Sequence, residues 1–398
     1  MNKFLILIII GIFLIPISSI IPSLGGLWYS QYISLSICLF FGIALFLWNF
    51  NKTLAIFDII CILSAFLITN LNSRAIILLF NLNFGCLGVY LLSKFNQQQR
   101  QVIIRSIFIL FLLQYLWLIL QANNISIPIN IKGRHIDITF KSIYDINKKE
   151  LVAFSASPDQ LGTFFALTLP VALYIHPLFA LLSLAGIFIS KSAFAFISGI
   201  SGGLIYFYFI RKKIFKILLI LILPIFLLFY FKYADKLTSA DFKTRGGVWK
   251  YAIQSTLKGN INIEHFGNNI TIKTNSLYGY GLGKFLLYFP FVPQKSNHFN
   301  FATEKFNHAH NDYIEIFFEL GIIGIISLIA LLTNFFKNFI SAKKSKELIM
   351  LFSCLVVYLL NSSGNFLSQI AVSGMLLMIY YGMFKGAMRE NGQTTASC

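Results

Sequence analysis

Charged side chains are scarce in this sequence. Asp, Glu, Lys and Arg make up 12% of the 398 residues, while hydrophobic residues make up 57%. A soluble domain of this length needs far more polar surface to stay in solution, so the composition excludes that class. Apolar runs of about 18 residues or more recur along the chain, and each is long enough to cross a bilayer core. Because no water is present there to satisfy the backbone, we expect these runs to be helices, and the fold class to be an all-α polytopic membrane protein.

Cysteine is also rare. The five cysteines show no metal-binding spacing and no plausible disulfide framework, and four of them lie inside apolar runs. We therefore expect them to act as small apolar side chains. They are Cys38, Cys61, Cys86, Cys354 and Cys398.

The apolar runs predict about twelve membrane spans. By residue number these are 4–22, 32–49, 53–70, 75–92, 103–120, 160–176, 178–190, 193–210, 214–231, 313–335, 348–361 and 366–384. Two longer polar segments interrupt the series. The predicted organisation is helices in 1–120, a loop in 121–159, helices in 160–231, a large loop in 232–312 and helices in 313–398.

Acidic residues are few: 14 Asp and Glu stand against 32 Lys and Arg, which gives a net charge of +18. The positive-inside rule explains most of this excess, because the basic clusters all fall on one side of the predicted spans. These clusters are Lys94 with Arg100, residues 211–213, residues 337–346, and Lys385 with Arg389. That side is predicted to be cytoplasmic with both termini, which puts the loops 121–159 and 232–312 on the opposite, outer face of the membrane.

The large loop is itself basic, which runs against the topology rule. It contains ten Lys or Arg residues and five Asp or Glu residues. Either an anionic ligand such as a phosphate or a merely solvated basic loop would account for this charge. Between about 242 and 258, Val248, Trp249, Ala252, Ile253 and Leu257 recur at roughly helical spacing, which is typical of an amphipathic helix on a membrane surface.

The segment His308-Ala309-His310-Asn311-Asp312 follows at the predicted mouth of the tenth span. A neutral imidazole there could accept a proton from an attacking hydroxyl, with Asn311 and Asp312 orienting it or the acceptor. The alternative is that these polar residues only cap the start of a helix, with Asp312 favoured by the helix dipole. A zinc site at His308 and His310 is not expected, since their spacing fits no usual ligand pattern.

This segment resembles the signature of the O-antigen ligase superfamily, which includes lipopolysaccharide ligases, polysaccharide polymerases and protein O-oligosaccharyltransferases. The family pattern is His, then Asn, Ser or Gln, nine residues, and Gly-x-x-Gly. Here His310-Asn311 is followed by nine residues and then Gly321-x-x-Gly324. Three other features fall in the family's order over about residues 155–330: Ser190-Lys191-Ser192, Arg245-Gly246-Gly247-Val248-Trp249 and Gly279-Tyr280-Gly281-Leu282-Gly283.

Two positions depart from the family pattern. Lys191 stands where the family usually has arginine, which keeps the charge but loses the bidentate fork suited to phosphate. Ser157-Pro158-Asp159-Gln160 only loosely resembles the family's Asn-Pro-Asn before the sixth span. Recognition of the glycan donor is therefore expected to differ in detail from that of the family.

The resemblance implies a fold like that of the large lipid-dependent (GT-C) glycosyltransferases and a metal-independent, inverting glycosyl transfer without a cofactor. The implied partners are an undecaprenyl-diphosphate-linked glycan, a lipid A–core or glycan acceptor and membrane lipids, with no nucleic acid. His310 would be the general base and Arg245 the main cation at the diphosphate leaving group. The other site residues implied or suggested for substrate binding are Lys191, His308, Asn311, Asp312, Trp249 and Arg134.

Ligation of a polymer to lipid A–core is the favoured activity, because the chain is compact and shows no added domain. The closest alternative is a polymerase that joins repeat units, followed by a protein O-oligosaccharyltransferase. A lipid-linked glycan flippase or transporter is the alternative from another class, and it predicts polar residues along a path through the spans. The informative residues instead gather in one loop on one face, which favours an enzyme.

Overall fold

A computed structural model describes eight main stretches of the chain. They are residues 88–123, 126–131, 134–139, 157–217, 240–265, 268–289, 308–365 and 371–391, together with scattered single positions, most of them between 60 and 86. This part is mostly helical, as predicted, and it also contains two short antiparallel hairpins. Much or all of the predicted spans at 4–22, 32–49, 53–70, 75–92 and 214–231 lies outside the described residues.

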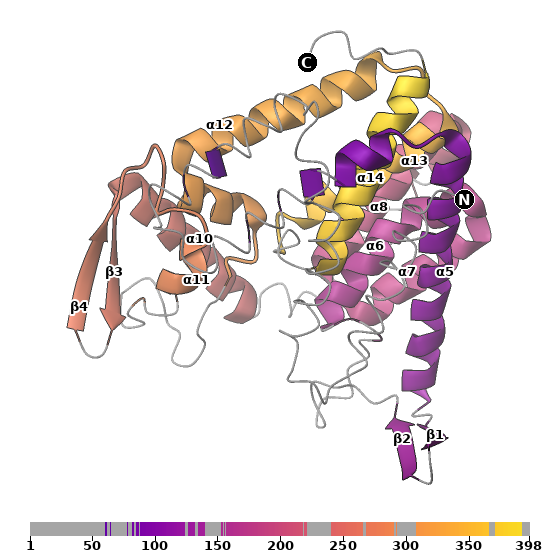
Figure 1. Cartoon of the computed structure of the whole chain (residues 1–398), viewed down its shortest axis with the longest axis horizontal. Coiled ribbons are helices and arrows are strands. Elements are labelled where there is room, and N and C mark those ends of the chain that lie inside the picture. Colours follow the sequence, from indigo (N-terminus) through magenta and orange to yellow (C-terminus); the bar gives the residue numbers. More distant parts are fainter. Residues whose placement is uncertain are drawn as a thin grey trace.

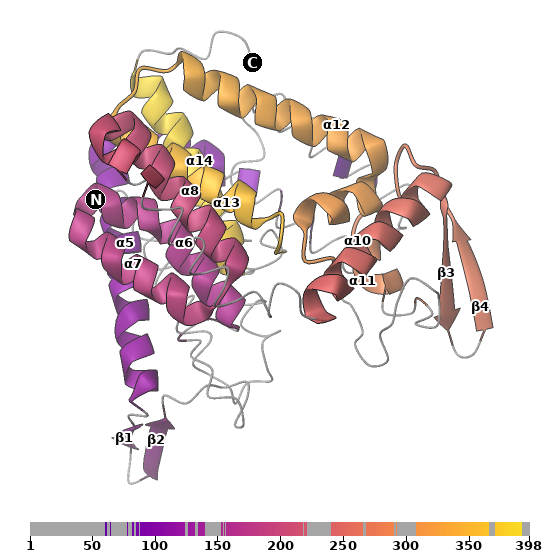
Figure 2. The same ribbon diagram turned by 180° about the vertical axis from the view of Figure 1, so that it is seen from behind.

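Six helices pack side by side into one bundle (Figures 1 and 2). They are α5 (Gln97–Ala122), α6 (Pro158–Ile175), α7 (Pro177–Ser190), α8 (Ala193–Ile210), α13 (Lys346–Asn361) and α14 (Ala371–Glu390). Each overlaps a predicted span, and α6, α7, α8 and α13 begin and end within two residues of the prediction. Within the described residues, α5, α8 and α12 (Asp312–Ser341) are long and apolar enough to cross a membrane.

Local capping explains why these helices begin and end where they do. Ser157 caps α6 by accepting the backbone N–H of Gln160, and Pro158 occupies the first turn. His176 is extended, as expected for a residue before proline, so α6 ends there and α7 starts at Pro177. The result is a tight antiparallel pair, with the first residues of α6 and the last of α7 at the same end of the bundle.

A second unit packs around its own hydrophobic core (Figure 1). It consists of α10 (Ala240–Lys258), β3 (Asn260–His265), β4 (Asn268–Lys273), α11 (Lys284–Tyr288) and the first turns of α12. The pairing runs from Asn260 opposite Lys273 to His265 opposite Asn268. The helix predicted near 242–258 is present, but Val248 and Ala252 are buried in this core, while Ile253 and Leu257 are exposed.

The hairpins lie in the two predicted loops. β1 (Ser126–Ile131) pairs with β2 (Arg134–Thr139), and β3 pairs with β4. In each strand isoleucine recurs at every second position, the pattern typical of strands. The all-α class predicted from the apolar runs did not include these hairpins.

Opposite the His310 segment, the bundle is held by a buried ion-pair triad. Arg100 is 2% exposed, and its guanidinium lies 2.5 Å from Glu347 on α13 and 2.7 Å from Glu390 on α14. Nearby, Arg389 donates to the carbonyl of Lys94 at 3.4 Å. Two of the predicted cytoplasmic clusters therefore meet at one end of the bundle, and Arg100 is a structural side chain inside it.

Candidate active site

The His310 segment forms a tight turn at the start of α12. His310 has a φ of 52°, the left-handed region that side chains other than glycine seldom adopt. Asn311 follows as the N-cap, and its side-chain oxygen accepts the backbone N–H groups of Tyr313 and Ile314 at 3.0 and 3.2 Å. The helix capping that the sequence offered as the alternative interpretation of this segment is therefore present, and it fixes the residue that directly follows the histidine.

Two side chains hold the backbone of Ala309 between the two histidines. The buried carboxylate of Glu315 accepts the Ala309 N–H at 2.7 Å and lies 3.4 Å from Nδ1 of His308. From α10, the indole N–H of Trp249 donates to the Ala309 carbonyl at 2.6 Å. Both backbone polar groups of Ala309 are thus satisfied, which ties the histidine turn to α10 and to the first turn of α12.

Arg245 reaches the bundle from α10. Its Nη1 donates to the Gly364 carbonyl at 3.2 Å, and its Nη2 lies 3.7 Å from the carboxylate of Asp159 at the start of α6. The Arg245 side chain is 14% exposed and that of Asp159 is 43% exposed. The guanidinium therefore sits at the boundary between the two units with part of its surface open, where it can meet an anion.

Gly364 belongs to the turn at residues 361–365, which follows α13. This turn also forms hydrogen bonds with the His310 segment. Asn311 donates its side-chain N–H to the Ser363 carbonyl at 2.8 Å, and the Asp312 backbone N–H donates to the Ser362 carbonyl at 3.0 Å. Arg245 and the His310 segment, separated by more than sixty residues in the sequence, thus bind three successive carbonyl groups.

The glycines of the motif let two backbones approach closely. Gly321 interrupts α12 with a φ of 63°, and Gly279 has a φ of 69°. A Cβ at position 321 would lie 2.5 Å from the Ser276 oxygen, and one at 279 would lie 2.6 Å from the Phe318 oxygen. The Tyr280 and Gly281 N–H groups bond the carbonyls that α12 exposes at its kink, at 2.9 and 2.8 Å. The Gly-x-Gly segment and the Gly-x-x-Gly end of the histidine motif are therefore one structural feature.

An aromatic cluster backs this contact. Tyr280 stacks on Phe318 with ring centroids 4.4 Å apart, and Phe285 stacks on Phe289 at 4.0 Å. The Tyr280 hydroxyl donates to the Ser255 carbonyl of α10 at 3.0 Å, and burial raises the pKa of this phenol well above its ordinary value. Tyr280 therefore stays neutral and acts as a fixed donor between α10 and α12.

The remaining predicted site residues are less closely connected. Lys191 is exposed and caps α7 in the left-handed conformation, at the end of the bundle where Asp159 begins α6. Arg134 lies in β2, and its side chain is outside the described residues. Within the described part of the chain, no three His, Cys, Asp or Glu side chains gather as a candidate metal site.

Three contributions to the site were not predicted: Glu315, Asp159 as a partner of Arg245, and the turn at residues 361–365. Glu315 was visible as an acid one helical turn after the cap. The turn is a polar run, Asn361-Ser362-Ser363-Gly364-Asn365, between two predicted spans on the same side as the large loop. Its position beside the histidine motif depends on tertiary contacts that no local pattern contains.

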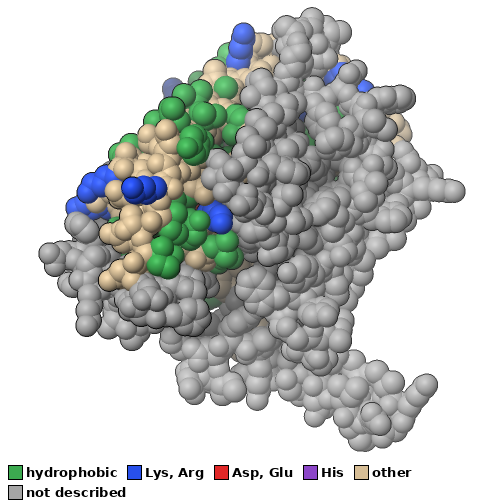
Figure 3. Space-filling model, turned by 60° about the vertical axis from the view of Figure 1, so that its left-hand side comes forward, with side chains coloured by type: hydrophobic (Ala, Val, Ile, Leu, Met, Phe, Trp, Pro, Cys, Tyr) green, Lys and Arg blue, Asp and Glu red, His purple; other side chains and the backbone are tan. Residues whose placement is uncertain are grey.

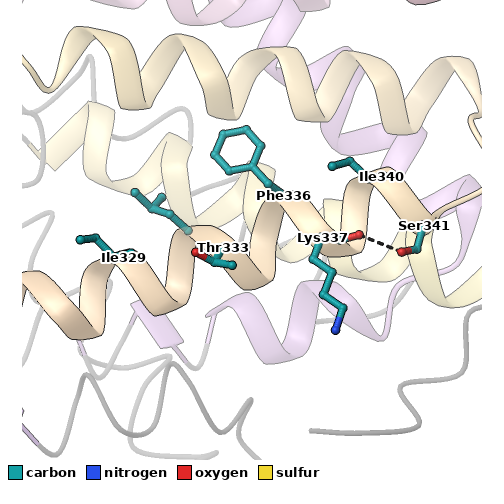
Figure 4. A pocket seen from close by; sticks show the side chains of 7 residues that line it. Ile329, Thr333, Phe336, Lys337, Ile340 and Ser341 are labelled. Carbon is teal, nitrogen blue, oxygen red and sulfur yellow. Dashed lines mark hydrogen bonds between the residues drawn. The ribbon is translucent and has the colours of Figure 1, made fainter.

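Two other surface features do not join the site. A shallow hollow on α12 is lined only by residues of that helix between Ile329 and Ser341, toward the helix end far from His310 (Figure 4). On the face in Figure 3, Lys and Arg side chains are scattered among hydrophobic ones, and no acidic side chain is visible on the described surface. Among the side chains that the structure describes in α10 and β4, the exposed lysines are Lys250, Lys258 and Lys273.

The apolar helices and their packing define a helical membrane protein. Comparison with known proteins is more specific: the O-antigen ligase family model matches residues 178–329, which include Lys191, Arg245, Trp249 and His310. A Rickettsia felis protein named "Putative polysaccharide ligase" is 30% identical over 112 residues, which are 27% of this chain and 26% of that protein. The chain thus matches about a quarter of this relative. The resemblance to the O-antigen ligase superfamily is confirmed.

Proposed function

We propose that this protein is a membrane enzyme that moves a glycan from an undecaprenyl-diphosphate carrier to an acceptor hydroxyl at the periplasmic face of a bacterial inner membrane. One observation carries the proposal: Arg245 and the His310 segment bind successive carbonyls of one turn. A cation for the leaving group and a base for the acceptor are thereby held in a common frame. The match to the O-antigen ligase family over residues 178–329 supports the same chemistry.

Arg245 is proposed to bind the diphosphate. As the bond between the sugar and the carrier breaks, negative charge grows on the phosphate oxygens, and a nearby guanidinium stabilises it. Gly364 and Asp159 engage Nη1 and Nη2, and the guanidinium keeps part of its surface exposed at the boundary between the two units, where a phosphate can approach it. Lys191 and Arg134 are proposed as further cations for the diphosphate, with Lys191 contributing charge without a bidentate fork.

His310 is proposed as the general base. Its imidazole takes the proton of the acceptor hydroxyl while the oxygen attacks the sugar carbon, and the bond to the carrier phosphate breaks with inversion. No metal ion or cofactor takes part in this proposed transfer. The histidine turn is held in place by His308, Trp249, Asn311 and Asp312. By fixing this turn, they are proposed to position the acceptor.

The favoured reaction is ligation of a finished polymer to lipid A–core, and polymerisation of repeat units uses the same site. The proposed fold remains about twelve spans of the GT-C type, with His310 outside and the Arg100 end inside. A gel of lipopolysaccharide from a deletion strain separates the two reactions. Bare core with polymer on the carrier indicates a ligase, and core capped by a single repeat indicates a polymerase.

Complementation of the deletion strain tests whether His310 is required for glycan transfer. We expect wild type to restore the pattern and His310→Ala to fail at equal expression. His176→Ala is the matched control, because His176 lies at the other end of α6. Restoration by His310→Ala would remove the base assignment. Flipping of a labelled lipid-linked glycan in proteoliposomes, with no transfer in any acceptor assay, would instead favour a transporter.

A further inference from the structure

The turn at residues 361–365 lies outside the part of the chain that matches the ligase family model, which ends at residue 329. We propose that this turn positions the active site, with Asn361 as its principal positioning residue. The proposal rests on the proposed function for its catalytic consequence, while its structural part stands on the contacts alone.

The first observation is convergence on the turn. The carbonyls of Ser362, Ser363 and Gly364 accept from Asp312, Asn311 and Arg245 at 3.0, 2.8 and 3.2 Å. Two residues before the turn, the Leu359 carbonyl accepts the hydroxyl of Tyr313 at 2.6 Å. These four bonds connect the unit of α10 and α12 to the bundle at one place.

The second observation is that the turn is anchored from behind. The Asn361 side chain is fully buried, and its amide N–H donates to Ser198 on α8 at 3.1 Å. Its amide oxygen accepts from Thr163 on α6 at 3.4 Å and from Asn365 at 2.6 Å. Asn361 thus fixes the turn to two bundle helices.

Together, the two observations imply that Asn361 acts on the active site through the turn and not by contact with the substrate. Arg245 and His310 belong to a unit with its own hydrophobic core, while the far half of α12 packs Phe335 and Phe339 into the bundle core. At the end of α12 where His310 lies, placement over the bundle depends on the bonds to this turn. A displacement of about 1 Å between catalytic groups can cost about 100-fold in rate. Loss of the Asn361 anchors should therefore slow transfer without removing any group that touches substrate.

The test compares Asn361→Ala with Ser353→Ala. Ser353 is buried in the same helix, and its hydroxyl bonds only the carbonyl of Ile349, one turn earlier, among the interactions described. Hydrogen exchange of the purified full-length protein reports placement without any substrate. We expect Asn361→Ala to speed exchange at 309–314 and to leave the amides of Ile322 and Ile323, which bond the Ser276 and Leu277 carbonyls, unchanged. Unchanged exchange at 309–314 would overturn the proposal.

The catalytic part of the proposal is tested by asking whether the effects of two substitutions on the transfer rate are additive. In complemented cells, the initial rate at which polymer-bearing lipopolysaccharide appears should fall about 100-fold in Asn361→Ala. The double variant with Arg245→Ala should be no slower than Arg245→Ala alone, because residues that act through one another do not add. Multiplied effects would overturn the positioning role.

If Asn361→Ala fails to fold, Asn365→Ala removes one anchor only, and the same exchange pattern is expected at smaller size. If wild type transfers no glycan in any background, the proposed function fails. The exchange experiment then still decides whether the turn positions Arg245 and the His310 segment.

Discussion

His310 combines a proposed chemical role with an uncommon backbone conformation. It is the base candidate of the motif, and its backbone lies in the left-handed region at a φ of 52°. Asparagine tolerates this conformation better than most residues, whereas β-branched side chains clash there. Substitutions at position 310 can therefore separate the chemical role of the imidazole from the conformational role of the residue.

We expect His310→Asn to fold with a melting temperature close to that of wild type and to lose about 100-fold or more of its transfer rate, as for removal of a general base. His310→Val should lose both activity and stability. Thermal melting in detergent and the initial rate of glycan transfer measure the two effects. Equal melting temperatures for the Asn and Val variants would contradict the conformational argument.

A second prediction concerns Arg245. Arg245→Lys keeps the charge but loses the fork that reaches Gly364 and Asp159 together, so phosphate would compete for a single ammonium group. We expect a transfer rate about 10-fold below wild type and above that of Arg245→Ala. Arg105→Lys on the exposed face of α5 is the control. Wild-type rates in Arg245→Lys would show that charge alone suffices.

At the scale of elements, helix positions were predictable because their signals are local. Ser157 with Pro158, and His176 with Pro177, end and start helices through bonds to nearby backbone, so the predicted limits agree closely with α6 and α7. The kink at Gly321 was not predictable, since the sequence around it continues an apolar helical pattern. It forms because the segment at 276–281 supplies alternative partners for the backbone.

This difference gives a prediction that compares Gly321, a glycine of the family pattern, with Gly246 in α10. Gly321→Ala should destabilise the protein by roughly 1–3 kcal/mol, because the residue has a positive φ and its Cβ would strike the Ser276 carbonyl. Gly246→Ala, in the exposed face of α10 with no atom within 4 Å of the added Cβ, should be neutral or stabilise by about 1 kcal/mol at most. Melting temperatures of the two variants in the same detergent provide the measurement. A similar loss in both would contradict the packing argument.

At the scale of the whole molecule, two hydrophobic cores are joined at one end by the turn at 361–365, while Arg100, Glu347 and Glu390 close the other end of the bundle. The charge pattern predicted the grouping of basic residues at that end. Neither the triad nor the turn was predicted, because both depend on residues far apart in sequence. The sequence pointed to the motif residues of the candidate site, whose roles stay predictions, but it did not predict the contacts that Glu315, Asp159 and the turn make with them.

The last prediction concerns the ion-pair triad of Arg100, Glu347 and Glu390. Glu347→Gln leaves the buried Arg100 charge with only a partly exposed partner, and breaking a buried pair costs about 3–5 kcal/mol. We expect a large drop in melting temperature and a normal transfer rate per folded molecule, measured by melting and by activity of the monodisperse fraction. Glu390→Gln should cost less, since Glu390 is 36% exposed. The reverse order would show that Glu390 is the stronger partner.

Under the proposed function, the position of the turn in the sequence also sets the time at which the site can become active. Ribosomes release Arg245 and His310 well before residues 361–365, and proteins fold from the N-terminus as they are made. The motif therefore emerges before α13 and the turn that follows it, which support it. A chain that stops short of this turn holds the signature residues but not the frame in which they are proposed to act.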